Sequence, residues 1–155
     1  MTFRRIALFI VVLSTLCVQV AGAGELMVHD AWIMLPPPNS NAAAFMKVSN
    51  HTDEAAVLVG AKSPVADRVE IHQSVMAEGV TRMEKLEMIS IPAGETLVLA
   101  PKGIHVMLFE PTALAEGSPV PMELEFKSGQ RVSTTADVQR RAPAKHNGGG
   151  SHSHH

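Results

Sequence analysis

Apolar and polar residues alternate over many short stretches of this chain. In Val69-Glu70-Ile71-His72, for example, every second side chain is apolar. A period of two is typical of a β-strand with one buried face. The pattern predicts extended segments at 25–35, 39–50, 55–63, 67–76, 80–91, 96–101, 104–110, 121–127 and 131–139. Many short strands of this kind favour a β-sandwich or barrel.

Proline and glycine turns separate these segments. Pro36-Pro37-Pro38 ends the first, residues 92–95 form a turn, and Ser128-Gly129-Gln130 joins the last two into a closing hairpin. Residues 41–45 are compatible with a helical turn, and we expect one at 112–117. No long amphipathic helix and no internal repeat stands out, so the predicted class is all-β.

Residues 1–23 have the features of a secretory signal peptide. Arg4 and Arg5 precede an apolar run over 6–20, and Ala21-Gly22-Ala23 forms an A-x-A cleavage site. An uncleaved N-terminal anchor is the alternative. Cys17 raises the question of a lipoprotein, but Leu16 stands before it, where such signals need a small residue. We therefore expect a periplasmic protein with no membrane span after cleavage.

Cleavage after Ala23 leaves 155 − 23 = 132 residues and removes the only cysteine, Cys17. The mature chain then has no thiolate and no disulfide, which excludes thiol–disulfide reductases and blue-copper electron carriers. Two of the 13 basic residues leave with the signal, so the formal charge becomes 11 − 15 = −4. No basic tract suggests nucleic-acid binding.

The last segment, 141–155, differs in composition from the domain expected at 24–140. It contains three consecutive glycines and a histidine-rich end, and we expect a flexible tail. Histidine tracts without thioethers favour Cu(II), Ni(II) or Zn(II). The hypothesis is that the tail collects Cu(II); the alternatives are an engineered tag or a non-specific surface tract. The candidate ligands are His146, His152, His154 and His155.

Residues 104–109, Ile-His-Val-Met-Leu-Phe, interrupt an apolar strand with one histidine. Because residues i and i+2 share a face, His105 and Met107 point the same way, while Ile104, Val106 and Leu108 face the core. His72 and Met83 lie upstream in two other predicted strands, and antiparallel pairing of neighbouring strands would bring all four together.

Two imidazoles and two thioethers form a soft, neutral ligand set that suits Cu(I). Zinc, calcium and magnesium favour other donors. The alternative is that these residues are structural, since buried methionines usually belong to a core.

Among the other candidates, Met76 is a spare thioether that we expect to pack or to line the mouth of the site, and Met88 is expected in the core. Met27, Met34, Met46 and Met122 are interpreted as core or surface residues, and His29 and His51 as structural.

The run from Val69 to Glu110 closely resembles periplasmic copper chaperones of the PCu(A)C type, whose hallmark is H-(M)-x10-M-x21-H-x-M. His72, Met83, His105 and Met107 match its spacing without a gap. Gln73 replaces the optional methionine. Residues 31–50, with Ala-Trp, prolines and a strand ending in Asn, also resemble the family, so that the likeness covers roughly 26–125.

The resemblance implies a cupredoxin-like Greek-key β-sandwich that binds Cu(I) as cargo through those four residues. It also implies delivery to the binuclear copper centre of cytochrome oxidase, together with other copper assembly factors. Thr81 stands where the family often has methionine, which leaves the ligand set intact.

No constellation of residues supports catalysis, so we do not expect an enzyme. The rivals to a chaperone are a copper buffering or resistance protein without a dedicated acceptor, a mono-copper redox protein, and a plain interaction domain. We expect a monomer.

Overall fold

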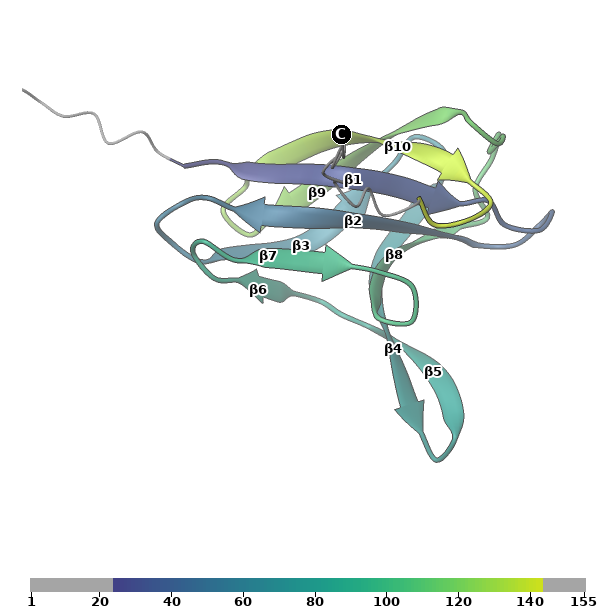
Figure 1. The fold of residues 1–155 in the computed structure, drawn as a ribbon, viewed down its shortest axis with the longest axis horizontal. Coiled ribbons are helices and arrows are strands. Elements are labelled where there is room, and N and C mark those ends of the chain that lie inside the picture. Colours follow the sequence, from purple (N-terminus) through teal and green to yellow (C-terminus); the bar gives the residue numbers. More distant parts are fainter. Residues whose placement is uncertain (1–23, 144–155) are drawn as a thin grey trace, which may run out of the picture.

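The computed structural model describes residues 24–143, and it contains no helix within them (Figure 1). The predicted signal peptide and residues 144–155 of the predicted tail lie outside the described residues. Ten strands follow one another: β1 Leu26–Met34, β2 Ala42–Asn50, β3 Ala56–Lys62, β4 Arg68–Ala77, β5 Val80–Lys85, β6 Ile89–Ile91, β7 Thr96–Leu99, β8 Ile104–Phe109, β9 Pro119–Phe126 and β10 Arg131–Gln139. The all-β prediction is confirmed.

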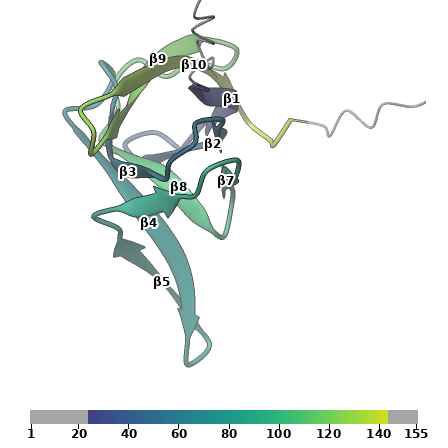
Figure 2. The same cartoon turned by 90° about the vertical axis from the view of Figure 1, so that its left-hand side faces the viewer.

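The strands form one hydrogen-bonded path in the order β5-β4-β8-β2-β1-β10-β9-β3-β6, with β7 paired to β2. All these pairs are antiparallel except β1 with β10. The sheet curls over on itself, so that β9 and β10 lie on one side of the molecule and β4 and β8 on the other (Figure 2). The predicted closing hairpin is confirmed as β9–β10.

A single apolar cluster fills the space inside the curled sheet. Strand β8 contributes Val106 and Leu108, both with no exposed surface, and β1 contributes Ile33. Strand β9 adds Met122 and Leu124 from the opposite side. The alternating apolar residues of β8 therefore face the core as predicted, and His105 and Met107 lie on the other face of the strand.

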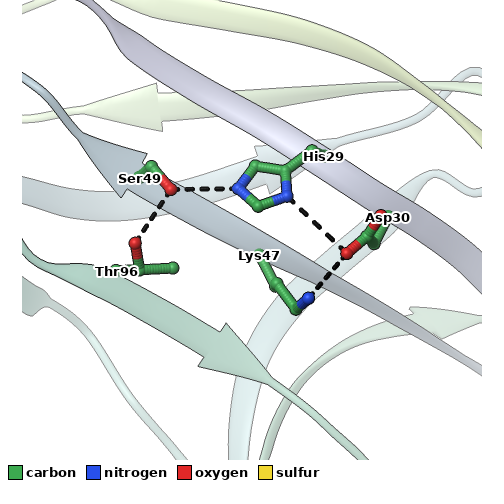
Figure 3. Close-up of polar contacts among 5 residues, drawn as sticks. All are labelled: His29, Asp30, Lys47, Ser49 and Thr96. Carbon is green, nitrogen blue, oxygen red and sulfur yellow. Dashed lines mark hydrogen bonds and ion pairs between the residues drawn. The ribbon is translucent and has the colours of Figure 1, made fainter. Parts of the chain in front are cut away.

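A polar cluster joins β1, β2 and β7 on the outside of the molecule (Figure 3). Imidazole Nε2 of His29 hydrogen-bonds with Oγ of Ser49, which also bonds to Thr96, each at 2.9 Å. Asp30 adopts a left-handed φ of 55° at the irregularity in the β1–β2 register, and its carboxylate accepts a 2.7 Å hydrogen bond from Lys47. The first predicted strand is therefore one strand with a bulge.

The predicted strand at 80–91 is wrong, because the structure divides it in two. Strand β5 pairs with β4, whereas β6 pairs with β3 at the far end of the sheet order. The chain changes partner over Leu86 to Met88, and Met88 lies in this connection with 60% of its surface exposed. The prediction that Met88 is a core residue is therefore also wrong.

Neither helical turn forms. Residues 42–50 are strand throughout. Residues 112–117 contain no helix, and Ala113 has a positive φ of 59°. The segment bonds to its neighbours instead: Thr112 N–H donates to the carbonyl of Val65, and Gly117 N–H donates to the carbonyl of Val138. One local bond forms, from Ser118 N–H to the carbonyl of Ala115 at 3.0 Å, and it closes a single turn that no helix continues.

Strands β4 and β5 form a hairpin that projects from the body of the molecule (Figures 1 and 2). Glu78 and Gly79 at its tip have φ values of 52° and 77°. Two consecutive residues with positive φ match the two-residue turn whose twist suits a tight hairpin. All six residues of β5 are exposed, so the free end of this hairpin adds little to the core.

Candidate metal centre

The pairing of β5, β4 and β8 brings the four predicted ligands onto neighbouring positions. His72 on β4 lies directly opposite His105 on β8. Met107 on β8 lies opposite Glu70, and Met83 on β5 lies opposite Ser74. Directly opposed residues of antiparallel strands share a face, as do residues two apart on one strand. The two histidines and two methionines therefore occupy one face of three adjacent strands.

His105 is oriented by a carbonyl at the start of its own strand. Its Nδ1 donates a 3.0 Å hydrogen bond to the carbonyl oxygen of Gly103, and the residue is only 3% exposed. A carbonyl only accepts, so the proton stays on Nδ1 and Nε2 carries a free lone pair. That Nε2 atom is buried and has no hydrogen-bond partner.

His72 is oriented by the carboxylate of Glu70. Its Nε2 donates a 2.8 Å hydrogen bond to that carboxylate, which leaves Nδ1 as a buried nitrogen without a partner. The hydrogen bond from His72 holds the pKa of the Glu70 carboxyl below its ordinary value, and the charges of Lys85 and Arg68 act in the same direction against partial burial. Glu70 is therefore an ionised acceptor that fixes the tautomer of His72.

Sequence reasoning missed Glu70 and the Gly103 carbonyl. Glu70 precedes His72 by two residues on a strand, so the same-face rule was the signal that pointed to it. The carbonyl of Gly103 carried no such signal, because its position depends on the turn that begins β8.

The two methionines differ in exposure. Met107 lies 9% exposed on β8, whereas Met83 is 57% exposed on β5. The histidines and Met107 thus form a buried floor, and Met83 forms the open side. An ion held by all four would be shielded from most solvent and still be reachable from the hairpin.

Aromatic rings surround the histidine pair. The His72 and His105 ring centroids lie 6.2 Å apart, with Phe109 5.9 Å from His72 and Phe45 6.3 Å from His105. Trp32, the only tryptophan of the chain, lies 4.7 Å from Phe45. These rings shield the imidazoles from water. The indole of Trp32, separated from His105 by the ring of Phe45, provides a fluorescent reporter for the site.

The donor set fits a soft monovalent ion. Two buried nitrogen lone pairs without partners are unusual, because buried polar atoms are normally hydrogen-bonded. Among residues 24–143, no three His, Cys, Asp or Glu side chains group in an arrangement suited to a metal. Met83 and Met107 are the thioethers that the same face adds to this pair of histidines, and thioethers favour Cu(I).

His29, a further histidine with polar side-chain partners among residues 24–143, does not form a hydrolase triad (Figure 3). Its Nδ1 lies 3.7 Å from the carboxylate of Asp30, beyond hydrogen-bonding distance, and that carboxylate is held by Lys47. Ser49 is 6% exposed and also hydrogen-bonds with Thr96. The cluster stabilises the β1–β2–β7 contact, in agreement with the structural role expected for His29.

The remaining predicted residues are placed as follows. Met46 and Met122 are buried, while Met27 and Met34 are partly exposed. Met76 is 75% exposed, so it does not pack. The tail histidines His146, His152, His154 and His155 lie outside the described residues. Within residues 24–143, no helix has the length and apolar character that crossing a bilayer requires.

The ten-stranded all-β fold is the cupredoxin-like fold of solved PCuAC copper-binding domains. The family model described as "Putative lipoprotein LpqE-like" matches residues 26–138. The chain belongs to the LpqE-like family. A relative described as "Putative lipoprotein Lxx21020", from Leifsonia xyli subsp. xyli, is 32% identical over 127 residues, which is 81% of this chain and 76% of that protein.

Solved structures share the fold. The Cu(I) form of DR1885 from Deinococcus radiodurans superposes with a TM-score of 0.63 at 28% identity, over 77% of this chain and 82% of that one. The copper-bound PCuAC domain of PmoF2 superposes with a TM-score of 0.63 at 23% identity, over 77% of this chain and 96% of that domain. The apo PCuAC domain of PmoF1 superposes with a TM-score of 0.62 at 24% identity, over 78% of this chain and 97% of that domain. The predicted cupredoxin-like fold and the PCu(A)C resemblance are confirmed.

Proposed function

We propose that this protein is an exported Cu(I) chaperone that holds the ion through His72, Met83, His105 and Met107. The observation that carries the proposal is the pair of buried imidazole nitrogens without partners, on directly opposed residues of β4 and β8. Leaving such atoms unpaired costs stability, and binding a metal would recover it. Relatives named for their copper-bound forms support the same assignment.

The site is tested by anaerobic titration of Cu(I) into protein lacking residues 146–155. One equivalent should bind, X-ray absorption should show mixed sulfur and nitrogen ligands, and Trp32 fluorescence should report saturation. Met83→Leu and Met107→Leu should each weaken binding by about tenfold or more, because each removes one ligand.

Two methionines supply matched controls. Met88 is 60% exposed like Met83, and Met122 is 2% exposed like the buried Met107. Leucine at either control position should leave Cu(I) affinity unchanged. Absence of a stoichiometric site in the unsubstituted protein would contradict the proposal and reduce the four residues to structural ones.

The acceptor we propose is the binuclear copper centre of cytochrome oxidase, reached in company with other copper assembly factors. A chaperone should pass Cu(I) to the apo copper-centre domain faster than to a small chelator of equal affinity. Equal rates would favour the rival function, a periplasmic buffer without a dedicated acceptor. We expect the protein to act as a monomer in this exchange.

We further propose that the tail histidines His146, His152, His154 and His155 bind Cu(II). Deleting residues 146–155 should abolish Cu(II) uptake and leave Cu(I) binding intact. Cu(II) binding that survives the deletion would refute this role.

The family description as a lipoprotein supports export and makes the processing of residues 1–23 worth a direct measurement. We propose cleavage after Ala23, with Cys17 removed. The intact mass of the exported protein distinguishes a chain starting at Gly24 from one that retains a lipid-modified Cys17.

A further inference from the structure

The projecting hairpin carries one more methionine on the face that bears the proposed ligands. Met76 on β4 lies opposite Thr81, and Ser74, two residues before it, lies opposite Met83. Met76 and Met83 are therefore diagonal neighbours on one face, a spacing that long side chains bridge. The four-ligand motif does not include Met76.

Exposure changes in order along this face. Met76 near the hairpin tip is 75% exposed, Met83 is 57% exposed, and Met107 beside the histidines is 9% exposed. Single exposed apolar residues are common on proteins and by themselves mean little. A series of thioethers that leads from solvent to two buried, unpartnered imidazole nitrogens is different, because a thioether is a donor that suits the same soft ion at each position.

We propose that Met76 is a transfer ligand that binds Cu(I) together with Met83 while the ion enters or leaves the site. This inference rests on the proposed function. In the step outward, a bond forms from Sδ of Met76 to Cu(I) as the bond from Sδ of Met107 breaks. One neutral thioether replaces another, so the copper stays Cu(I) and neither charge nor coordination number changes.

The shape of the molecule suits this step. The hairpin extends beyond the rest of the sheet (Figure 1), and the exposed side chains of Met76 and Met83 leave its ligand face accessible to an acceptor. The two-residue turn at Glu78 and Gly79 keeps β4 and β5 in register up to the tip, where Ala77 pairs with Val80. Met76 is thus held beside Met83 by backbone pairing, although its own side chain is not buried.

The test compares Met76→Leu with Met88→Leu in the full mature chain. Two quantities are measured for each: the equilibrium Cu(I) affinity, and the rate at which a bidentate Cu(I) chelator removes the ion. Met76→Leu should leave affinity within about twofold and slow removal about tenfold, which corresponds to roughly 1.4 kcal/mol of lost stabilisation at the barrier. Met88→Leu should change neither.

Three outcomes would overturn the inference. Removal of Cu(I) from Met76→Leu at the unsubstituted rate would show that Met76 takes no part in transfer. A large loss of affinity would make it a resident ligand, and slowing by Met88→Leu as well would indicate a general effect of surface methionines. All three presuppose a Cu(I) site in the unsubstituted protein, so failure of the proposed function itself is seen separately, as absence of that site.

Discussion

At the scale of single residues, the site depends on two acceptors that hold the imidazoles in the correct tautomers. Glu70 does this for His72 through a 2.8 Å hydrogen bond. Glu70→Ala should lower Cu(I) affinity by about 10- to 100-fold, the usual effect of removing a group that orients a metal-bound histidine. Competition with a Cu(I) chelator measures the change.

Glu70→Gln is the matched control, because its amide oxygen still accepts from Nε2 of His72. It should retain most of the affinity that Glu70→Ala loses. If both variants bind Cu(I) as tightly as the original protein, Glu70 does not position His72. Thermal unfolding of the metal-free variants verifies that the fold persists.

Substitution of His105 should change the stability of the metal-free protein and its Cu(I) affinity in opposite directions. His105→Leu should raise the stability of the metal-free protein by about 1 kcal/mol, because it removes a buried nitrogen that has no partner. The carbonyl of Gly103 keeps a donor, since Ser74 N–H bonds to it at 3.1 Å. Cu(I) binding should be lost, and urea unfolding of the metal-free protein measures the gain.

A destabilised His105→Leu variant would mean that the unpartnered nitrogen costs nothing in the metal-free protein. Met122→Leu, a substitution at a buried position on β9, provides the comparison for the effect of repacking alone. Its stability should stay equal to or below that of the original protein.

Strands were the most predictable elements, and the reason is their alternation. Strand β10 matches its predicted bounds, Arg131–Gln139, and β8 differs by one residue. The split of 80–91 was not predictable, because β5 is exposed on both faces and its sequence continues into β6 without a glycine or proline. Only the tertiary pairing, with β4 in one case and β3 in the other, decides where one strand ends.

The two-residue turn of the β4–β5 hairpin predicts a local effect. Gly79 has a φ of 77°, and no atom lies within 4 Å of the position where a Cβ would be. Gly79→Ala should therefore cost only backbone strain, about 1 kcal/mol. Because β5 buries nothing in the core, amide exchange in β5 should accelerate by roughly fivefold while Tm stays nearly unchanged.

Gly60→Ala is the control for this prediction. Gly60 lies in β3, where the nearest contact of an added Cβ is an ordinary 3.5 Å to the Glu125 side chain. It should leave exchange in β5 unchanged. A large fall in Tm for Gly79→Ala would show that the hairpin and the core unfold together.

At the scale of the whole molecule, the sequence predicted the fold class, which the structure confirms, and a candidate ligand set, which stays a prediction, by two different routes. Strand alternation pointed to an all-β fold, whereas the spacing of His72, Met83, His105 and Met107 pointed to a family. Neither route predicts the projecting hairpin or the place of Met76 on it. These follow from the register of three strands, which single-strand patterns do not contain.

The outer polar cluster predicts how global stability responds to acid. The hydrogen bond and charge of Lys47 hold the pKa of Asp30 below its ordinary value of 3.8. A carboxyl with a lowered pKa stabilises the fold above its unfolded-state pKa, and this contribution is lost as pH falls through the folded-state value. Asp30→Asn should thus lower Tm by about 1–3 °C at pH 7, and the deficit should shrink as pH falls below 3.8 towards the lowered folded-state pKa.

The substitution tests charge rather than backbone, because asparagine also tolerates the left-handed φ of 55° at this bulge. Lys47→Met removes the other partner, so it should reproduce the loss at pH 7, and the double variant should lose no more than either single one. Asp53→Asn removes the same charge from an exposed position that forms no ion pair with the described residues. Scanning calorimetry at low salt from pH 3 to pH 7 provides the comparison. An Asp30→Asn deficit that persists undiminished at pH 3 would mean that the cluster stabilises the protein through the shape of the bulge instead of through the Asp30–Lys47 pair.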